Sequence, residues 1–374
     1  MKNSFIPVNT PLLGGNELKY VTDCVKTGWI SSEGSYVSKF ESAVAKRVNR
    51  NYGVAVSNGT AAIDIAISAL NIVKGDEIIL PTHTIISCVT HIVRSGIIPV
   101  LVDSDPVTWN MDVSQIENKI TNKTKAIMAV HLYGLPVEMD KIMFLAKKYN
   151  LFVIEDAAEM LGQTYKGVPC GSFGDISTMS FYPNKQVTSG EGGMCLTNNL
   201  ELSDRCRSLR NLCFQKHKRF VHKELGWNYR MTNLQAAIGL AQVERLDFHV
   251  KRKREIGNKY LSLFRDLIGV QLPLKSTPAA ENIFWVFGLV LNSSVSFDAE
   301  FAMKKLSEKG IGVRPFFYPL HKQPIFQKMN MFLGEKYPEA EKLGERGFYI
   351  PSGLGISDKE INKCASLVID FFNS

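Results

Sequence analysis

Two short stretches of the chain carry residues that together could perform amine chemistry. Lys185 lies in the segment Ser-Phe-Tyr-Pro-Asn-Lys-Gln-Val-Thr-Ser-Gly-Glu-Gly-Gly-Met, which begins with the hydroxyl-bearing Ser180. Glycines follow the lysine at Gly190, Gly192 and Gly193. Upstream, Asp156 ends the run Leu-Phe-Val-Ile-Glu-Asp. An unprotonated lysine amine attacks carbonyl carbons, and a carboxylate stabilises a positive charge near it.

This lysine and aspartate fit a site for pyridoxal 5′-phosphate (PLP). We interpret Lys185 as the amine that forms a Schiff base with the cofactor aldehyde, which requires it to lose its proton near neutral pH. Asp156 would then face the pyridinium nitrogen and favour its protonated form, so that the ring acts as an electron sink. The competing interpretation is a solvated lysine near glycines and an acidic turn after a strand. The order and setting of the two elements favour the cofactor site.

The elements around these residues follow an alternating pattern of strands and helices. Apolar runs lie at Val54–Val56, Ile78–Leu80, Pro99–Val102, Ala126–Val130, Leu151–Ile154, Ile176–Ser180 and Met194–Leu196. Helical patterns lie at Ala61–Leu70, Ile85–Ser95, Val113–Ile120 and Met139–Tyr149. Such alternation predicts a mostly parallel sheet with helices on both faces. Sites in such sheets lie at the carboxyl ends of strands, where Asp156 is expected.

The predicted fold is α/β, with two domains. Residues 1–250 are predicted to form a large PLP-binding domain that includes an N-terminal arm and a seven-stranded, mostly parallel sheet. Residues 251–374 are predicted to form a smaller α+β domain. Its expected elements are a strand at Phe284–Leu291, a helix at Asp298–Lys309 and a closing helix at Asp358–Phe372. A long helix from Asn233 through the charged run Lys251–Arg254 is expected to carry the boundary.

Composition narrows the class of protein. The apolar fraction of 45% and charged fraction of 21% over 374 residues are ordinary for a soluble enzyme with two cores. The apolar run Ile283–Leu291 is too short to span a bilayer, and no signal segment follows Met1. The seven cysteines are scattered without a Cys-x-x-Cys pair, which favours reduced thiols in a cytoplasm over disulfides or zinc. We therefore expect a cytoplasmic protein without a membrane partner.

The net charge of +8 is compatible with nucleic acid, anionic lipid or a phosphorylated substrate. The basic residues do not form a recognisable nucleic-acid motif, so a phosphate-rich small molecule is the favoured partner. No cluster has metal-ligand spacing, and we expect no metal. Neither a Gly-x-Ser-x-Gly elbow nor a Gly-x-Gly-x-x-Gly fingerprint is present.

A phosphate site is predicted where Ser57-Asn-Gly-Thr60 opens a helix. Gly59 allows close approach of the backbone, and the amides at a helix start attract anions, although a plain N-cap explains the same residues equally well. Glu159 and His131 lie near strand ends. A turn glutamate and a structural histidine are the competing interpretations for these two.

Nearly end to end, the chain resembles the sugar aminotransferases of the DegT/DnrJ/EryC1/StrS family, a branch of the fold-type I PLP enzymes. The matching pieces are Ile6–Val8, Gly28–Ser31, Val56–Thr60, Val130–Gly134, Glu155–Ala158, Gly171–Asp175, Ser180–Phe181, Lys185, Gly190–Gly193, Asn228–Met231 and Pro319–His321. The resemblance implies the two-domain fold of that group, PLP as cofactor, and transamination.

The resemblance also implies roles for individual residues. Lys185 and Asp156 match the Schiff-base lysine and the pyridinium partner, and Glu159 matches a contact to the cofactor 3′-oxygen. Phosphate contacts are implied for Gly59, Thr60, Ser180 and Asn228. The asparagine would reach over from the other subunit of a homodimer with shared sites. Residues 214–227 are expected to cover the nucleotide end of the substrate. Predicted substrate contacts are Trp29, Ser31, His83, Arg219, His222, Arg314 and His321; solvated loop charges are the alternative for Arg219 and His222.

Two features bear on the cofactor face and the reaction. Ile85 stands where many relatives stack an aromatic ring on the cofactor, and His83 makes this pocket unusual. A dehydratase branch of the family has histidine in place of the lysine, so Lys185 implies transamination.

Within the family, residues 219–233 and 314–319 look most like those of 4-aminotransferases acting on GDP-4-keto-6-deoxymannose with L-glutamate, for O-antigen or another surface polysaccharide. Two alternatives stay open. One is a UDP- or dTDP-linked keto sugar, or amination at C3, and the other is a PLP-binding regulatory protein without turnover.

Overall fold

A computed structural model describes residues 5–215 and 217–373 of the chain. Seven of the described strands form one sheet, and their spatial order is β1 (Tyr52–Val56), β9 (Gly193–Thr197), β8 (Ile176–Ser180), β5 (Phe152–Asp156), β4 (Thr124–Val130), β2 (Glu77–Pro81) and β3 (Ile98–Val102). The neighbouring pairs from β8 to β3 are parallel, whereas β9 is antiparallel to both β1 and β8. The predicted mostly parallel, seven-stranded sheet is confirmed.

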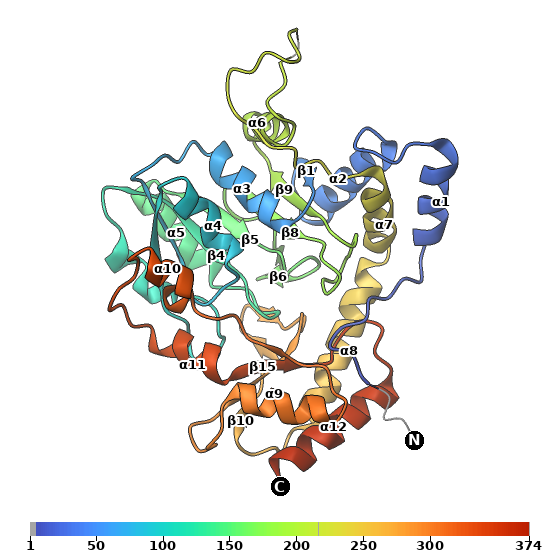
Figure 1. The fold of residues 1–374 in the computed structure, drawn as a ribbon, viewed down its shortest axis with the longest axis vertical. Coiled ribbons are helices and arrows are strands. Elements are labelled where there is room, and N and C mark those ends of the chain that lie inside the picture. The colour runs from blue at the N-terminus through green and yellow to red at the C-terminus, as the bar shows by residue number, and fades with distance from the viewer. Residues whose placement is uncertain (1–4, 216, 374) are drawn as a thin grey trace.

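Helices cover both faces of this sheet (Figure 1). Apolar residues of β2 alternate between two cores, with Ile78 and Leu80 in one and Ile79 in the other. The first core contains buried side chains of α3 (Gly59–Ala69), α4 (Ser87–Arg94) and α6 (Leu200–Arg210). The second core contains buried side chains of α2 (Ser35–Arg47), α5 (Met139–Tyr149) and α7 (Asn233–Val243), and α1 (Glu17–Thr27) packs on α7. Because side chains of a strand alternate between faces, a strand covered on both sides is largely apolar.

A second sheet lies beyond the first and belongs to the C-terminal region. Its order is β10 (Val270–Gln271), β13 (Phe287–Leu291), β15 (Gly347–Ile350) and β14 (Arg314–Pro315). The helices of this region are α9 (Ala299–Glu308), α10 (Pro324–Lys328), α11 (Pro338–Arg346) and α12 (Asp358–Phe372), with a 3₁₀ turn η3 (Leu320–Lys322). A third core unites α9, α12 and this sheet. The helix α8 (Leu246–Leu263) leads from α7 into it (Figure 1).

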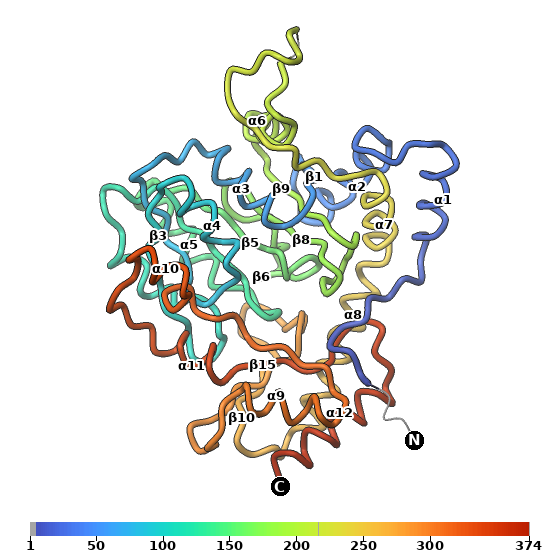
Figure 2. The backbone as a smooth tube through the Cα atoms, in the orientation of Figure 1, coloured from blue at the N-terminus to red at the C-terminus, as the bar shows by residue number. Residues whose placement is uncertain are grey.

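The N-terminal arm packs against the C-terminal region. Ile6 exchanges backbone hydrogen bonds with Gly310 and Gly312 at 2.9 and 2.8 Å. Figure 2 shows this N-terminal arm beside the C-terminal elements, and also shows the loop after α6 projecting away from the body. Two short ribbons complete the fold: β6 (Thr164–Tyr165) with β7 (Val168–Pro169), and β11 (Ser276–Thr277) with β12 (Ala280–Glu281).

Three expected elements differ from the structure. The predicted helix over 113–120 is wrong, because η1 (Val113–Gln115) and η2 (Glu117–Lys119) are separate 3₁₀ turns. The long helix breaks between Val243 and Leu246 into α7 and α8. The strand expected from Phe284 begins at Phe287. The predicted domain boundary at residue 250 falls inside α8 and stays a prediction.

Two general expectations can be compared with the described residues. Among their helices, none has both the length and the apolar character needed to cross a membrane. All seven cysteines lie within the described residues and are buried free thiols. The reduced state that their scattered spacing favours stays a prediction.

Candidate active site

A cavity of about 640 Å³ lies at the carboxyl ends of β4, β5 and β8 and is closed on one side by the C-terminal region. His131 borders it, and so do seven residues with predicted cofactor contacts: Gly59, Thr60, Ile85, Asp156, Glu159, Ser180 and Lys185. They come from α3, the approach to α4, β5 and its following turn, β8, and the segment after β8. The sheet therefore collects residues more than 120 positions apart at one edge, as expected for this fold class.

Lys185 points its amine into the interior of this site. The segment after β8 turns back on itself, with the amide of Lys185 donating to Tyr182 O at 3.0 Å and that of Ser189 to Phe181 O at 3.0 Å. Nζ lies 3.9 Å from Glu159 Oε1 and 3.9 Å from the centre of the Trp285 ring. Burial lowers the pKa of the Lys185 amine, against the opposing effect of Glu159. The amine is thus easier to deprotonate than a solvated lysine.

Asp156 is held by three donors at the end of β5. Its Oδ1 accepts from Ala158 N at 3.1 Å and from Thr178 Oγ1 at 3.3 Å, and its Oδ2 accepts from Cys88 Sγ at 3.3 Å. Burial raises the pKa of the Cys88 thiol well above its ordinary value, so this thiol stays a donor. Asp156 is only 3% exposed, yet it borders the cavity. It is therefore an oriented acceptor for a cationic group placed there.

Glu159 is the second carboxyl group on the cavity. Its Oε2 accepts from the amide of Tyr133 at 2.7 Å, which leaves Oε1 on the side of Lys185. Burial raises the pKa of Glu159 to about 8. A carboxyl group with this pKa keeps its proton at neutral pH and can donate a hydrogen bond.

The donors at the start of α3 fit the phosphate of PLP. The Asn58 side chain accepts from Ala61 N at 2.8 Å and caps the helix, so the plain N-cap is also present. Gly59 and Thr60 precede the capped amide at the positive end of the helix. A Cβ on Gly59 would lie 3.0 Å from Ser180 Cβ and would narrow the space between them. The residues present therefore fit PLP, with a phosphate cradle, an amine and a carboxylate around one cavity.

Two predicted substrate contacts lie in the protein interior. His83 is fully buried beside Tyr133, whose hydroxyl lies 3.2 Å from His83 Nε2, and burial lowers the pKa of His83 to about 3. His321 Nδ1 lies 2.8 Å from Thr82 Oγ1, and its Nε2 lies 2.9 Å from Glu341 Oε1. Neither histidine borders the cavity, so a contact between substrate and either one stays a prediction.

The other predicted contacts lie outside the cavity in this single chain. Trp29, Ser31, Arg219, His222, Asn228 and Arg314 are all exposed. Within the loop at 214–227, the Arg219 guanidinium lies 5.0 Å from the Phe214 ring centre, and His222 Nδ1 donates to Leu212 O at 2.8 Å. Residue 216 of this predicted loop lies outside the described residues. The roles assigned to these residues stay predictions.

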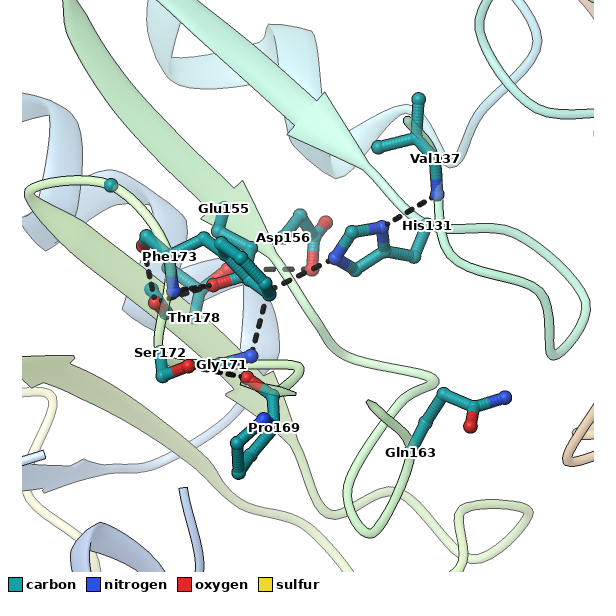
Figure 3. A network of polar contacts seen from close by, with 12 residues as sticks. His131, Val137, Glu155, Asp156, Gln163, Pro169, Gly171, Ser172, Phe173 and Thr178 are labelled. Carbon is teal, nitrogen blue, oxygen red and sulfur yellow. Dashed lines mark hydrogen bonds and ion pairs between the residues drawn. The ribbon is translucent and has the colours of Figure 1, made fainter. Parts of the chain in front are cut away.

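A buried polar network lies next to Asp156, centred on Glu155 (Figure 3). Glu155 Oε1 accepts from His131 Nε2 at 3.0 Å and from Gly171 N at 2.7 Å, and Oε2 accepts from Phe173 N at 2.8 Å and Ser177 Oγ at 3.0 Å. Because Val137 N donates to His131 Nδ1 at 3.1 Å, the proton of the imidazole is on Nε2. His131 is thus a satisfied structural histidine.

The same network includes a group with metal-ligand character, His131, Glu155 and Cys170. The imidazole nitrogens and both carboxylate oxygens already have hydrogen-bond partners. Burial raises the pKa of the Cys170 thiol well above its ordinary value, whereas metals bind the thiolate. The donor set does not favour a metal ion here.

Sequence reasoning missed several residues that border the cavity, and Trp285 is foremost among them. Others are Tyr182, Phe317, Tyr349, Arg94 and Tyr229. Trp285 lies in an apolar run that reads as a core strand. No local pattern distinguishes such a residue from ordinary core.

Comparisons with known proteins show which family the chain is similar to. The DegT/DnrJ/EryC1/StrS aminotransferase family matches residues 11–368. A GDP-perosamine synthase from Escherichia coli O157:H7 is 44% identical over 369 residues, 99% of each chain. One from Vibrio cholerae is 38% identical, covering 98% of this chain and 99% of that protein. The structure of an aminotransferase from Psychrobacter cryohalolentis has a TM-score of 0.89 at 27% identity and covers 99% of each chain.

Proposed function

Because the chain belongs to the DegT/DnrJ/EryC1/StrS aminotransferase family, we propose that it converts GDP-4-keto-6-deoxymannose and L-glutamate into GDP-perosamine and 2-oxoglutarate. The choice of sugar is supported by full-length relatives that carry the name GDP-perosamine synthase. The observation that carries the proposal is the placement of Lys185, whose side chain is 11% exposed, and buried Asp156 on one cavity. An aminotransferase needs both an amine that can lose its proton and an anion that keeps a ring nitrogen charged.

PLP is the cofactor of this family, and when bound it supplies an aldehyde that condenses with amines and a ring that accepts electrons. In the proposed site Lys185 would hold the aldehyde and, once released, would move protons at the reacting carbon. Asp156 keeps the proton on the ring nitrogen. Gly59, Thr60 and Ser180 hold the phosphate, and Glu159 lies toward Lys185. Ile85 provides an apolar surface at the cavity.

The substrate is proposed to enter from the exposed side of the cavity. Arg219, His222 and Arg314 are solvent-exposed groups that could meet a diphosphate, in keeping with the net charge of +8. We further propose a homodimer in which Asn228 completes the phosphate site of the partner. The product would serve a surface polysaccharide such as O-antigen, and the enzyme would act in the cytoplasm.

A substrate panel tests the proposal. Purified protein with PLP and isotope-labelled L-glutamate is offered GDP-, UDP- and dTDP-linked 4-keto sugars and a UDP-linked 3-keto sugar, and products are read by mass spectrometry and NMR. Label at C4 of the GDP-linked sugar is the expected result. Turnover confined to a UDP- or dTDP-linked sugar, or nitrogen at C3, would overturn the proposed substrate and leave the aminotransferase class intact.

The regulatory alternative predicts a different outcome in the same assay. A protein that binds PLP without turnover would keep its cofactor absorbance unchanged when L-glutamate is added. The proposed enzyme should instead lose that absorbance as the cofactor takes up the amino group of L-glutamate. It should regain the absorbance when the keto sugar is then added.

A further inference from the structure

Trp285 brings an aromatic surface from the C-terminal region to the reacting amine. The centre of its indole ring lies 3.9 Å from Lys185 Nζ, and the residue borders the cavity while being only 4% exposed. Its indole N–H donates to Asn184 O at 3.0 Å, directly before the lysine. The same side chain therefore contacts both the amine and the backbone that carries it.

The backbone around Trp285 is shaped to reach this position. Ile283 N donates to Gly134 O at 3.1 Å, and Phe284 has a φ of 50°, in the left-handed region. Gly134 has a φ of 112°, and a Cβ there would lie 2.6 Å from the amide of Phe284. A bulky residue in the left-handed region is uncommon and marks a position that the surrounding structure enforces. Trp285 follows this left-handed position two residues before β13 begins, and it borders the cavity at the edge of the first sheet.

Contacts of both its backbone and its ring hold Trp285 in place. Its carbonyl accepts from Lys253 Nζ at 2.8 Å, and the same amine donates to Ser352 O at 2.6 Å. Its ring stacks on that of Tyr133, with centroids 6.2 Å apart and planes 10° from parallel. The backbone of Trp285 is thus held to α8 and the C-terminal region and its ring to the turn after β4, so the ring can hold a constant position against the amine.

We propose that Trp285 is a further residue of the catalytic centre, whose indole face keeps water from the Lys185 amine and fixes the direction of that amine. The inference rests on the proposed role of Lys185 as the cofactor-bearing lysine. An amine shielded from water loses its proton more readily, and only the unprotonated form attacks a carbonyl.

Two effects of the ring on the amine oppose each other. Contact of a cation with an aromatic face favours the protonated amine. Exclusion of water favours the neutral amine and can move a lysine pKa by up to about 3–5 units. The charged or titratable groups that face the amine are Glu159, Asp156 and Cys88, and each of them favours the protonated amine when it is itself ionised. Because burial nevertheless outweighs them, removing the shield should raise the pKa of Lys185.

The test measures the protonation of Lys185 in the full-length chain. Cofactor-free protein is treated with an amine-modifying reagent across a pH series, and modification of the Lys185 peptide is followed by mass spectrometry. In parallel, the pH midpoint of the bound-cofactor absorbance is measured in the loaded protein. Trp285→Ala and Trp285→Gln remove the ring, Trp285→Phe keeps an aromatic face, and Phe144→Ala at an exposed position of α5 is the control. Circular dichroism and gel filtration identify the folded variants.

In Trp285→Ala or Trp285→Gln, whichever is folded, we expect the modification midpoint to rise by about one unit or more. Trp285→Phe and Phe144→Ala should stay close to the parent chain. A folded ring-less variant with an unchanged midpoint would overturn the proposal, as would a shift in Trp285→Phe as large as in Trp285→Ala. No sugar enters this measurement, so its failure and a failure of the proposed substrate are distinguishable.

Discussion

Oε1 of Glu159 lies 3.9 Å from Nζ of Lys185, and the two side chains are only 6% and 11% exposed. Burial raises the pKa of the carboxyl group to about 8 and lowers the pKa of the amine. The proton affinities of the two groups are therefore closer together than they are in water. When the proton affinities of an amine and a neighbouring group are matched in this way, a proton can move between them near neutral pH at low energetic cost.

Lys185→Ala should abolish transamination while the fold stays intact. The variant lacks the amine that holds the cofactor and moves protons, and we expect turnover to fall by at least about 10³-fold. Borohydride treatment should attach the cofactor permanently to the Lys185 peptide of the parent chain and not to the variant. Lys166→Ala, at an exposed turn, is the matched control. Activity equal to the parent chain would exclude the assigned role.

Asp156→Asn should keep some affinity for PLP but slow proton transfer strongly. The neutral amide cannot favour a charged ring nitrogen, and a loss of about 10²–10⁴-fold in kcat is expected. Single-turnover absorbance changes after mixing with L-glutamate measure this step. Cys88→Ala, which removes one donor to Asp156 without changing its charge, should have a smaller effect. Near-normal single-turnover rates in Asp156→Asn would contradict the electron-sink role.

Glu159→Gln should change the pH dependence of stability. The pKa of Glu159 is raised from 4.5 to about 8, so between these values the folded chain holds a proton that the unfolded chain has lost. The free energy of unfolding must then fall as pH rises through this range, and the glutamine variant lacks that loss.

Between pH 5 and pH 8, the free energy of unfolding of the variant, relative to that of the parent chain, should rise by at least about 1.4 kcal/mol, which is the equivalent of one pKa unit. Urea unfolding of cofactor-free protein at several pH values measures this difference. The exposed Glu138→Gln supplies the baseline. If the free energy of unfolding changes with pH in the same way in Glu159→Gln and in the parent chain, Glu159 has an ordinary pKa.

Glu155→Gln should destabilise the fold without any dependence on metal. An amide NH₂ in place of one carboxylate oxygen would face N–H or O–H donors that now point at Glu155. Loss of such buried partners costs about 1–3 kcal/mol, and more when a charge is involved. Urea unfolding measures the loss, with Glu117→Gln at an exposed site as control. A chelator should leave the melting temperature of the parent chain unchanged, and a fall would point to a metal at this network.

Much of the fold follows from short-range pattern. The seven apolar runs become the seven strands of the first sheet, because strands buried on both faces must be apolar whatever their neighbours are. The region at 113–120 failed as a helix for a local reason. Asp112 accepts from Ser114 N at 3.0 Å and from Gln115 Nε2 at 2.8 Å, which sets a tight turn. The buried pair Val113 and Ile116 is spaced by three residues, which a 3₁₀ turn satisfies as well as an α-helix does.

By itself, the sequence determined the order of strands and helices, the family, and the lysine and aspartate on which PLP chemistry depends, since these are carried by periodicity and by motifs. Only the tertiary structure decided what surrounds the amine. It buried His83 and His321 away from the cavity, and it placed Trp285 against Lys185 from a hundred residues downstream. Contacts of that range depend on how the C-terminal region packs against the core of the large sheet, and no local pattern of residues records that packing.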